Sequence, residues 1–188
     1  MTYDPPVVVY DACVLYPFQL RNLLVELADQ GLVAARWTDA IHDEWIRNVA
    51  KRFPVPRRRL LALRDLMKSV LPDADVRGSE PIIPTLSLPD EADRHVLAAA
   101  IATGASAILT WNVKHFPTSA LAPYGIRAID ADTFLTELAE RDLEAMTAVI
   151  EMARQNLRLT EPSPDAYLTA LKRQGLKSLV ALLRKSRT

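Results

Sequence analysis

The sequence predicts an α/β domain built on a central, mainly parallel β-sheet, followed by a helical extension. Short apolar runs alternate with helical patterns from residue 7 to about residue 130, which is typical of strands connected by helices. The apolar runs are continuous, as expected for strands that are buried on both faces. Beyond residue 131 only helical patterns remain. We therefore expect a first domain over residues 1–135 and a C-terminal helical extension over residues 136–188.

Each element has a local cause in the sequence. The first strand is rich in β-branched residues, and Thr38 can cap the helix that follows the second strand. The predicted strands cover residues 7–10, 32–37, 105–110 and 126–129. Apolar residues three and four positions apart predict helices over residues 18–30, 39–52, 57–70 and 91–103, with one or two more in each of 131–156 and 165–185. The proline-rich segment 72–89 should be mainly loop, with room for a short strand near Val76 or Ile82-Ile83.

Composition limits the classes of protein to which the chain can belong. Apolar residues make up 49% of the 188 residues, enough for a sizeable core, and Lys plus Arg equals Asp plus Glu at 23 each. Nucleic-acid-binding proteins are often basic overall, so any RNA contact here must come from a local patch or through a metal ion. The densest basic stretch is either a solvated face or a groove for an RNA backbone, and it holds Arg47, Lys51, Arg52, Arg57, Arg58, Arg59 and Arg64.

Cysteine usage and hydropathy predict a cytoplasmic protein. Cys13 is the single cysteine, so no internal disulfide can form, which fits a reducing cytosol. The N-terminal segment MTYDPPVVVYD lacks the basic stretch and the long apolar run of a signal peptide. No segment approaches the ~20 uninterrupted apolar residues of a transmembrane helix, so no membrane association is expected. We expect Cys13 to be packed in the core and inert.

Oxygen-bearing side chains recur where the predicted strands end and helices begin. Asp11 directly follows the first strand, and Asn112 stands two residues beyond the strand ASAILT. Glu44 and Asp93 lie in the first turns of predicted helices. The carboxyl ends of parallel strands meet at one edge of a sheet, where the helices that follow strands also begin. We therefore expect all four side chains to reach one cleft.

The grouping of three carboxylates indicates a bound divalent cation. Without a cation the carboxylates would repel each other, and their pKa values would rise. Mg²⁺ and Mn²⁺ prefer oxygen ligands. Such an ion can bind a phosphodiester oxygen and promote attack by water, so that hydrolysis needs no nucleophilic side chain. These residues predict metal-dependent hydrolysis of a phosphodiester.

Four segments of the chain resemble the PIN-domain nucleases, and within them the branch of bacterial toxins related to VapC. The segments occur in order between about residues 5 and 135, and they are VVVYDACVLYP, TDAIHDEWIRN, LPDEADRHVLAAAIATGA and AILTWNVKHFP. The resemblance implies a three-layer α/β/α fold and a ribonuclease that acts on single-stranded or structured RNA. It implies catalytic metal ligands at Asp11, Glu44, Asp93 and Asn112, with Asp90 as a further candidate.

The same resemblance implies partner proteins, and the chain departs from the family pattern at two positions. Related proteins often have a cognate antitoxin that blocks the site, and they often form homodimers. Many PIN nucleases carry aspartates where this chain has Asn112 and His115. An asparagine can offer its carbonyl oxygen but adds no charge, so a second metal ion would bind more weakly or not at all, and the sequence leaves one ion or two open. The tail after about residue 135 matches no motif.

Several candidate residues also have ordinary structural roles. Asp90 is a good helix N-cap, and the helix dipole would favour Asp93 in the first turn without any metal. Thr110 either orients a ligand or simply ends a strand, and Asn112 either binds metal or belongs to a turn. Lys114 lies close enough to the expected cleft to meet a phosphate.

For the aromatic and histidine side chains near the expected cleft, the sequence gives weaker grounds for a functional role. We expect His95 and His115 to be structural or solvent-facing, because Mg²⁺ and Mn²⁺ prefer oxygen. Trp45 and Trp111 lie near the site in the sequence. Trp111, beside Asn112, could stack on a base, although a packing role would explain it at least as well.

Two other classes of function are disfavoured, and one remains open. A haloacid-dehalogenase-like phosphatase needs a second aspartate two residues after the first, where this chain has Cys13. A nucleotide-binding oxidoreductase needs a glycine-rich loop after the first strand, but the whole chain has five glycines. The open alternative is a PIN-like RNA- or protein-binding module whose metal site is weakened by Asn112.

Overall fold

The computed structural model of the chain describes residues 4–186, so residues 1–3 and 187–188, at the outer ends of the two predicted units, lie outside the described residues. The strands are β1 (Val7–Tyr10), β2 (Ala34–Arg36), β3 (Ala107–Leu109) and β4 (Arg127–Ile129). The helices are α1 (Ala12–Leu15), α2 (Phe18–Asp29), α3 (Asp39–Arg52), α4 (Arg57–Val70), α5 (Arg94–Ala102), α6 (Thr118–Leu121), α7 (Ala131–Arg141), α8 (Leu143–Gln155), α9 (Pro164–Arg173) and α10 (Lys177–Lys185). Short 3₁₀ helices are η1 (Pro72–Ala74), η2 (Glu80–Thr85), η3 (Glu91–Asp93), η4 (Val113–His115) and η5 (Ala122–Tyr124).

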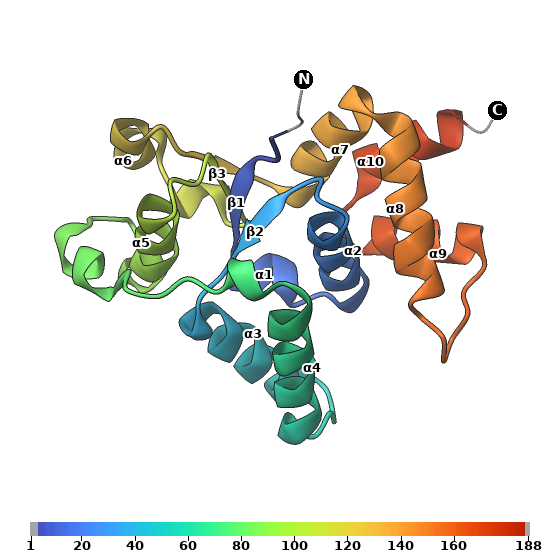
Figure 1. The fold of residues 1–188 in the computed structure, drawn as a ribbon, viewed down its shortest axis with the longest axis horizontal. Helices are drawn as coiled ribbons and strands as arrows, with labels where there is room; N and C mark the ends of the chain where they lie inside the picture. The colour runs from blue at the N-terminus through green and yellow to red at the C-terminus, as the bar shows by residue number, and fades with distance from the viewer. Residues whose placement is uncertain (1–3, 187–188) are drawn as a thin grey trace.

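The strands form one parallel sheet in the order β2-β1-β3-β4, which confirms the predicted fold class. Val8 of β1 pairs with Ala35 of β2 on one side and with Ala107 of β3 on the other. Parallel strands need crossover connections, and here helices provide them. Figure 1 shows α5 on one side of β1 and α2 on the other, so the sheet lies between helical layers.

Coverage of both faces explains the continuous apolar sequence of β1. The side chains of Val8, Val9 and Tyr10 are fully buried, although neighbouring positions on a strand face opposite ways. The Tyr10 hydroxyl donates a hydrogen bond to the carbonyl oxygen of Leu24 in α2 (3.3 Å). One face of β1 is therefore packed against α2. The strand is short and ends directly before Asp11, the first polar side chain at this edge of the sheet.

The segment between α4 and α5 is mainly turns and loop, as predicted. It forms the turns η1 and η2, and the short strand for which the sequence left room near Val76 is reduced to a single bridge between Trp37 and Asp75. Prolines in this segment lack the amide hydrogen that a strand donates to its neighbour. The sheet therefore stops at β2, apart from that one bridge.

Two helices near the expected site also differ from the sequence prediction. The helix expected over residues 91–103 begins with the tighter turn η3, and α5 covers only 94–102. The short helix α1, directly after Asp11, has too few residues to show a helical pattern in the sequence.

Among the described residues, no helix has both the length and the apolar character needed to cross a membrane.

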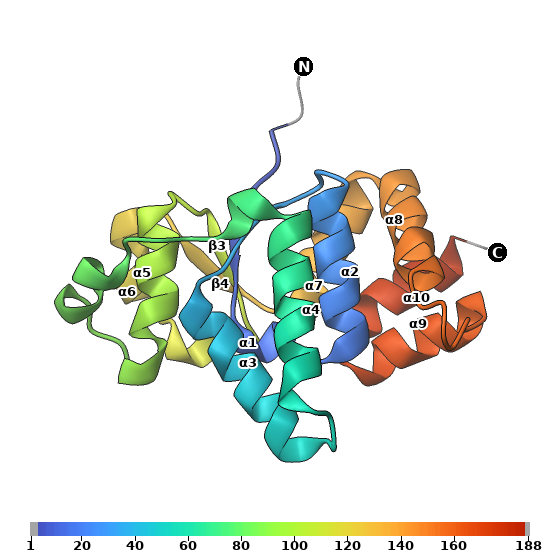
Figure 2. The same ribbon diagram turned by 60° about the horizontal axis from the view of Figure 1, so that its bottom comes forward.

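The C-terminal helices pack against α2. The side-chain amide of Asn22 in α2 donates to the carbonyl oxygen of Ala153 in α8 (2.6 Å), and that of Asn156 donates to the Glu26 carboxylate (2.6 Å). Figure 2 shows α2 between α4 and the C-terminal helices. The predicted division at residue 135 lies inside α7 and stays a prediction.

His42 is a fully buried histidine on α3 whose protonation opposes folding. Its Nδ1 accepts a hydrogen bond from the indole Nε1 of Trp45 (3.0 Å), and its Nε2 has no partner among the described residues. Burial, reinforced by the positive charge of Lys68, lowers the pKa of His42 from 6.5 to about 4. The folded protein therefore takes up this proton at a lower pH than the unfolded chain does.

We expect His42 to reduce the free energy of unfolding by roughly 3 kcal/mol as the pH falls from about 6.5 to about 4. In this window the unfolded chain binds a proton that the folded protein does not, whereas at higher pH neither state is protonated at this ring. Urea unfolding of the wild type and of His42→Gln, over a series of pH values, checks this. The variant should lose stability less steeply, and parallel curves would contradict the assignment.

Candidate metal centre

The edge of the sheet brings together two polar side chains that are far apart in the sequence. Asp11 follows β1, Thr110 follows β3, and the pair continues the register in which Tyr10 lies opposite Leu109. The Thr110 hydroxyl donates a hydrogen bond to Asp11 Oδ2 (2.6 Å), and both side chains are buried. The parallel pairing of β1 and β3 therefore determines where the Asp11 carboxylate lies.

Cys13 also contacts Asp11, and it packs partly buried against the core, close to its predicted place. Its thiol is half-buried and donates to Asp11 Oδ2 (3.1 Å), while its sulfur accepts a hydrogen bond from the backbone N–H of Trp111 (3.2 Å). Burial, with the negative charge of Asp11, raises the pKa of Cys13 to about 12, so the group stays a neutral thiol that can donate. The helix α1 turns Cys13 back toward Asp11, and this contact is absent from any pattern in the sequence.

The two donors converge on one oxygen of Asp11. Thr110 and Cys13 both bind Oδ2, and no hydrogen bond from the described residues reaches Oδ1. The Thr110 hydroxyl in turn accepts from the backbone N–H of Asn112 (3.0 Å). This chain of contacts fixes the carboxylate plane and leaves Oδ1 available for a ligand.

A second cluster lies at the start of α5. His115 Nδ1 is 2.7 Å from Asp93 Oδ2 and 3.9 Å from Asp90 Oδ2, and ligand atoms of the three residues all lie within 4.8 Å of one another. Asp90 also caps η3 by accepting from the backbone N–H of Ala92 (2.9 Å), so its predicted capping role is confirmed. The turn η4, which follows β3 in the chain, brings His115 to these aspartates.

Electrostatic interactions link the two clusters. Burial raises the pKa of Asp93, and the negative charges of Asp11 and Asp90 raise it as well, while the hydrogen bond from His115 opposes them. No described Lys or Arg forms an ion pair with any of the three aspartates. Carboxylates gathered without a basic counter-charge, one of them buried with an open oxygen, fit a divalent cation.

Glu44 and Asn112 are placed differently from Asp11 and Asp93. The half-buried Glu44 lies 3.7 Å from His95 Nε2, and no described contact joins it to Asp11 or Asp93. His95 is two residues after Asp93, so Glu44 lies beside the start of α5. Asn112 approaches Thr110 with its backbone, and its side-chain amide makes no described hydrogen bond.

The tryptophans near the site are packing residues. Trp45 is fully buried and provides no exposed face for a base. Trp111 is half-buried and packs against Gly175, where a Cβ atom would come within 2.8 Å of the indole ring. The turn between α9 and α10 therefore supports Trp111, which lies between Thr110 and Asn112 in the chain.

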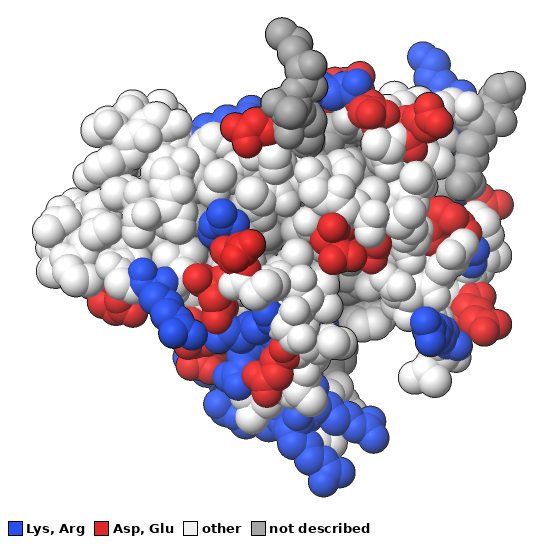
Figure 3. All heavy atoms as spheres, in the orientation of Figure 1, with Lys and Arg blue, Asp and Glu red and all other residues white. Residues whose placement is uncertain are grey.

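Basic side chains gather beyond the ends of α3 and α4. Arg57, Arg58 and Arg59 are exposed in the first turn of α4, close in the chain to the exposed Lys51 and Arg52. Figure 3 shows basic side chains concentrated at the lower end of the molecule, where Figure 1 places these helices. Lys114 is also exposed, on η4. The chain thus has a local basic surface despite its zero net charge.

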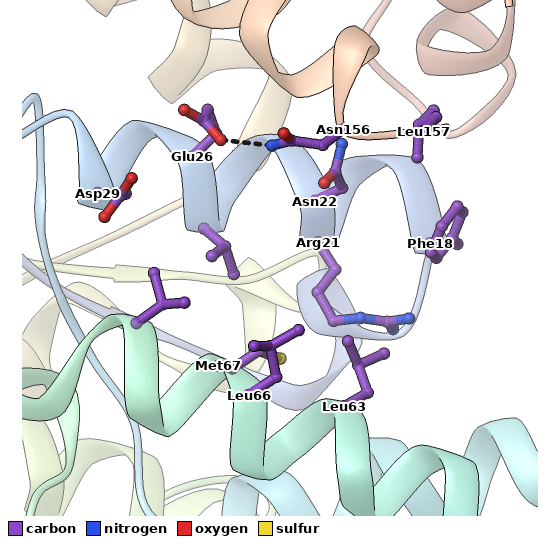
Figure 4. Close-up of a pocket in the computed structure, with 12 residues that line it drawn as sticks. Phe18, Arg21, Asn22, Glu26, Asp29, Leu63, Leu66, Met67, Asn156 and Leu157 are labelled. Atoms are coloured by element: carbon purple, nitrogen blue, oxygen red, sulfur yellow. Dashed lines mark hydrogen bonds between the residues drawn. The ribbon is translucent and has the colours of Figure 1, made fainter. Parts of the chain in front are cut away.

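An apolar groove between α2 and α4 was not predicted from the sequence. One hollow of about 480 Å³ and another of about 590 Å³ share Phe18, Arg21 and Leu63 in their linings. Figure 4 shows the Arg21 side chain extending between the two helices, with Leu63 and Leu66 opposite it on α4. Arg21 is only 5% exposed, and burial lowers its pKa to about 10. The half-exposed Phe18 and the exposed Leu66 leave apolar surface in this groove open to solvent.

Comparison with known proteins covers both parts of the chain. Residues 7–114 match the PIN domain family, and residues 131–185 match the VapC50 C-terminal domain family. The chain is 43% identical over 83 residues to a Mycobacterium tuberculosis protein named "Putative ribonuclease VapC50", a match that covers 44% of this chain and 48% of that protein. The match thus spans about half the length of this relative. No solved structure matches significantly. Because its PIN-domain match covers more than half of the residues, the chain belongs to the PIN-domain family.

Proposed function

We propose that this protein is a metal-dependent endoribonuclease, the toxin of a cytoplasmic toxin–antitoxin pair. The observation that carries the proposal is the grouping of Asp11, Asp93 and Asp90 at the carboxyl edge of the sheet without a Lys or Arg partner among the described residues. Family membership and the similarity to a VapC-type relative support the same reaction class. The proposed metal is Mg²⁺ or Mn²⁺.

Each site residue has a proposed role that follows from its place. Asp11, Glu44, Asp93 and Asn112 are the proposed catalytic ligands, with Asp90 beside them, and a bound divalent cation would supply positive charge to the phosphodiester. Thr110 and Cys13 hold Asp11 through its Oδ2, so that Oδ1 is left for the proposed metal in a carboxylate that is already oriented. Glu44 lies beside His95 and would have to turn away from it to join the others.

The proposed substrate contacts are basic and independent of sequence. Lys114 is carried by the turn that directly follows Asn112, which suits contact with a phosphate near the cleavage site. Arg57, Arg58 and Arg59 would bind the RNA backbone farther away, with an affinity that falls as salt rises. Trp45 is fully buried and Trp111 packs on Gly175, which favours backbone contacts over base stacking.

A protein partner is part of the proposal. We propose a cognate antitoxin that covers the apolar groove between α2 and α4, because Phe18 and Leu66 are exposed there. A homodimer is a second proposed assembly. We also propose that residues 1–135 form the nuclease domain and that residues 136–188 form an extension that supports it, as the packing of α8 on α2 suggests.

RNA cleavage tests the proposed activity. Purified wild type, incubated with structured RNA and Mn²⁺, should cleave it, and a chelator should stop the reaction. Asp11→Asn should reduce cleavage by at least about 100-fold, because the variant loses a charged ligand whose orientation is fixed by two hydrogen bonds. Cleavage that survives both the chelator and the substitution would eliminate the metal mechanism.

The alternative is a PIN-like binding module, and two observations favour it. Asn112 adds no charge, and Glu44 pairs with His95, so the site holds less negative charge than four acidic ligands would provide. In that case wild type would bind RNA in a metal-sensitive manner and leave it intact. The cleavage assay, run beside a filter-binding assay on the same RNA, separates the two functions.

A further inference from the structure

His115 stands where a metal in the proposed site would meet a nitrogen atom. We propose that His115 is a metal ligand through its imidazole and that it makes the site favour Mn²⁺ over Mg²⁺. The proposal rests on the proposed metal-dependent function, and it reverses the sequence-based expectation that this histidine has no part in metal binding.

The geometry of η4 is the first step. η4 follows Asn112 directly, and the backbone N–H of His115 donates to the Asn112 carbonyl (2.8 Å). The next residue, Phe116, is only 2% exposed and anchors the end of the turn in the core. The His115 side chain itself is 28% exposed, so its ring lies at the surface of the site and is held there by a short, fixed turn.

The position of the ring relative to the acids is the second step. His115 Nδ1 is 2.7 Å from Asp93 Oδ2, and Asp90 Oδ2 is 3.9 Å away, so one ion can contact an atom from each of these residues. A separate observation points to a cation at this edge. Asp11 is 3% exposed, its Oδ1 takes no described hydrogen bond, and its charge acts on Asp93.

The chemistry of the donor set is the third step. Mg²⁺ strongly prefers oxygen ligands and keeps much of its water, whereas imidazole suits later divalent metals better. A neutral imidazole also adds a ligand without adding a negative charge. Among three aspartates that already repel each other, this reduces the charge that a single ion has to balance. An aspartate at position 115 would provide an all-oxygen site that accepts Mg²⁺ more readily.

A structural role for His115 predicts different results. If the ring only holds Asp93 through their hydrogen bond, it would stay beside the carboxylate and would not touch the metal. His115→Gln would then preserve much of that hydrogen bond and leave the metal affinity nearly unchanged. Pulsed electron paramagnetic resonance distinguishes the two roles, because a directly bound imidazole nitrogen couples magnetically to Mn²⁺.

The experiment loads the full chain with Mn²⁺ and compares wild type, His115→Gln, His115→Asp and the matched control His95→Gln. We expect a nitrogen coupling in wild type and in the His95 variant, and none in either His115 variant. Isotope labelling of histidine with ¹⁵N should change the wild-type coupling accordingly. Calorimetry should show that His115→Asp lowers the preference for Mn²⁺ over Mg²⁺ by roughly tenfold.

The outcomes separate this proposal from the proposed nuclease. Mn²⁺ binding and RNA cleavage without any nitrogen coupling would overturn the role of His115 and leave the nuclease intact. A coupling that persists in His115→Gln would also overturn it. If Asp11→Asn binds Mn²⁺ as tightly as wild type and neither protein cleaves RNA, the proposed function itself fails.

Discussion

Overproduction of the wild-type protein in bacteria should slow growth, and Asp93→Ala should relieve this arrest. Asp93 is at the centre of the site's electrostatics, since burial and the charges of Asp11 and Asp90 all raise its pKa. Removing it takes away a proposed metal ligand whose carboxylate lies beside His115 and Asp90. We expect cleavage to fall at least about 100-fold, which is the scale of losing a transition-state contact. Growth curves with matched expression levels measure the effect.

The control for this prediction is Glu140→Ala. Glu140 is exposed on α7, so its loss changes the net charge by the same amount without touching the site. It should arrest growth as strongly as wild type. Equal arrest by the Asp93 variant, with immunoblots showing similar protein levels, would count against a toxic activity at this site.

Gly175→Ala should destabilise the protein by roughly 2–5 kcal/mol. Gly175 has a φ of +108°, a backbone conformation that residues with a side chain rarely adopt. An added Cβ would also lie 2.8 Å from the indole of Trp111. Trp111 cannot move freely, because its backbone N–H binds Cys13 next to Asp11. We therefore expect thermal and urea unfolding to shift strongly and Mn²⁺ binding to weaken.

Gly125→Ala provides the matched control for Gly175→Ala. Gly125 has a φ of +67°, yet nothing lies within 4 Å of the position of an added Cβ. It should therefore show the backbone strain alone, about 1 kcal/mol. Similar losses in the two variants would mean that the contact with Trp111 contributes nothing.

Most of the fold could be predicted, because its causes are local. β1 and β3 are apolar throughout since both faces are covered, and their limits are marked by Asp11 and Thr110. The helix α3 was predicted to the residue, from Thr38 at its cap to its last basic residue. In the segment around Val76, which was predicted to be mainly loop, prolines and 3₁₀ turns leave only one bridge to the sheet.

The candidate site was predicted only in part. Asp11 and Asp93 could be placed because strand ends and helix starts in a parallel sheet share one edge. The contacts of Cys13 with Asp11 and of His115 with Asp93 were missed, because neither residue type suggests a site for a hard cation in sequence. The role of Glu44 as a metal ligand remains a prediction, since its contact in the structure is with His95.

The sequence by itself determined the elements, their order and the edge on which the acidic residues stand, since these depend on periodicity and chain direction. Only the tertiary structure decided which groups meet there. Asp93 and His115 are 22 residues apart, and Asp11 and Thr110 are 99 apart. Trp111 and Gly175 are brought together from opposite parts of the chain. Such contacts depend on how separate elements pack, and no local pattern of side chains encodes the distances between them.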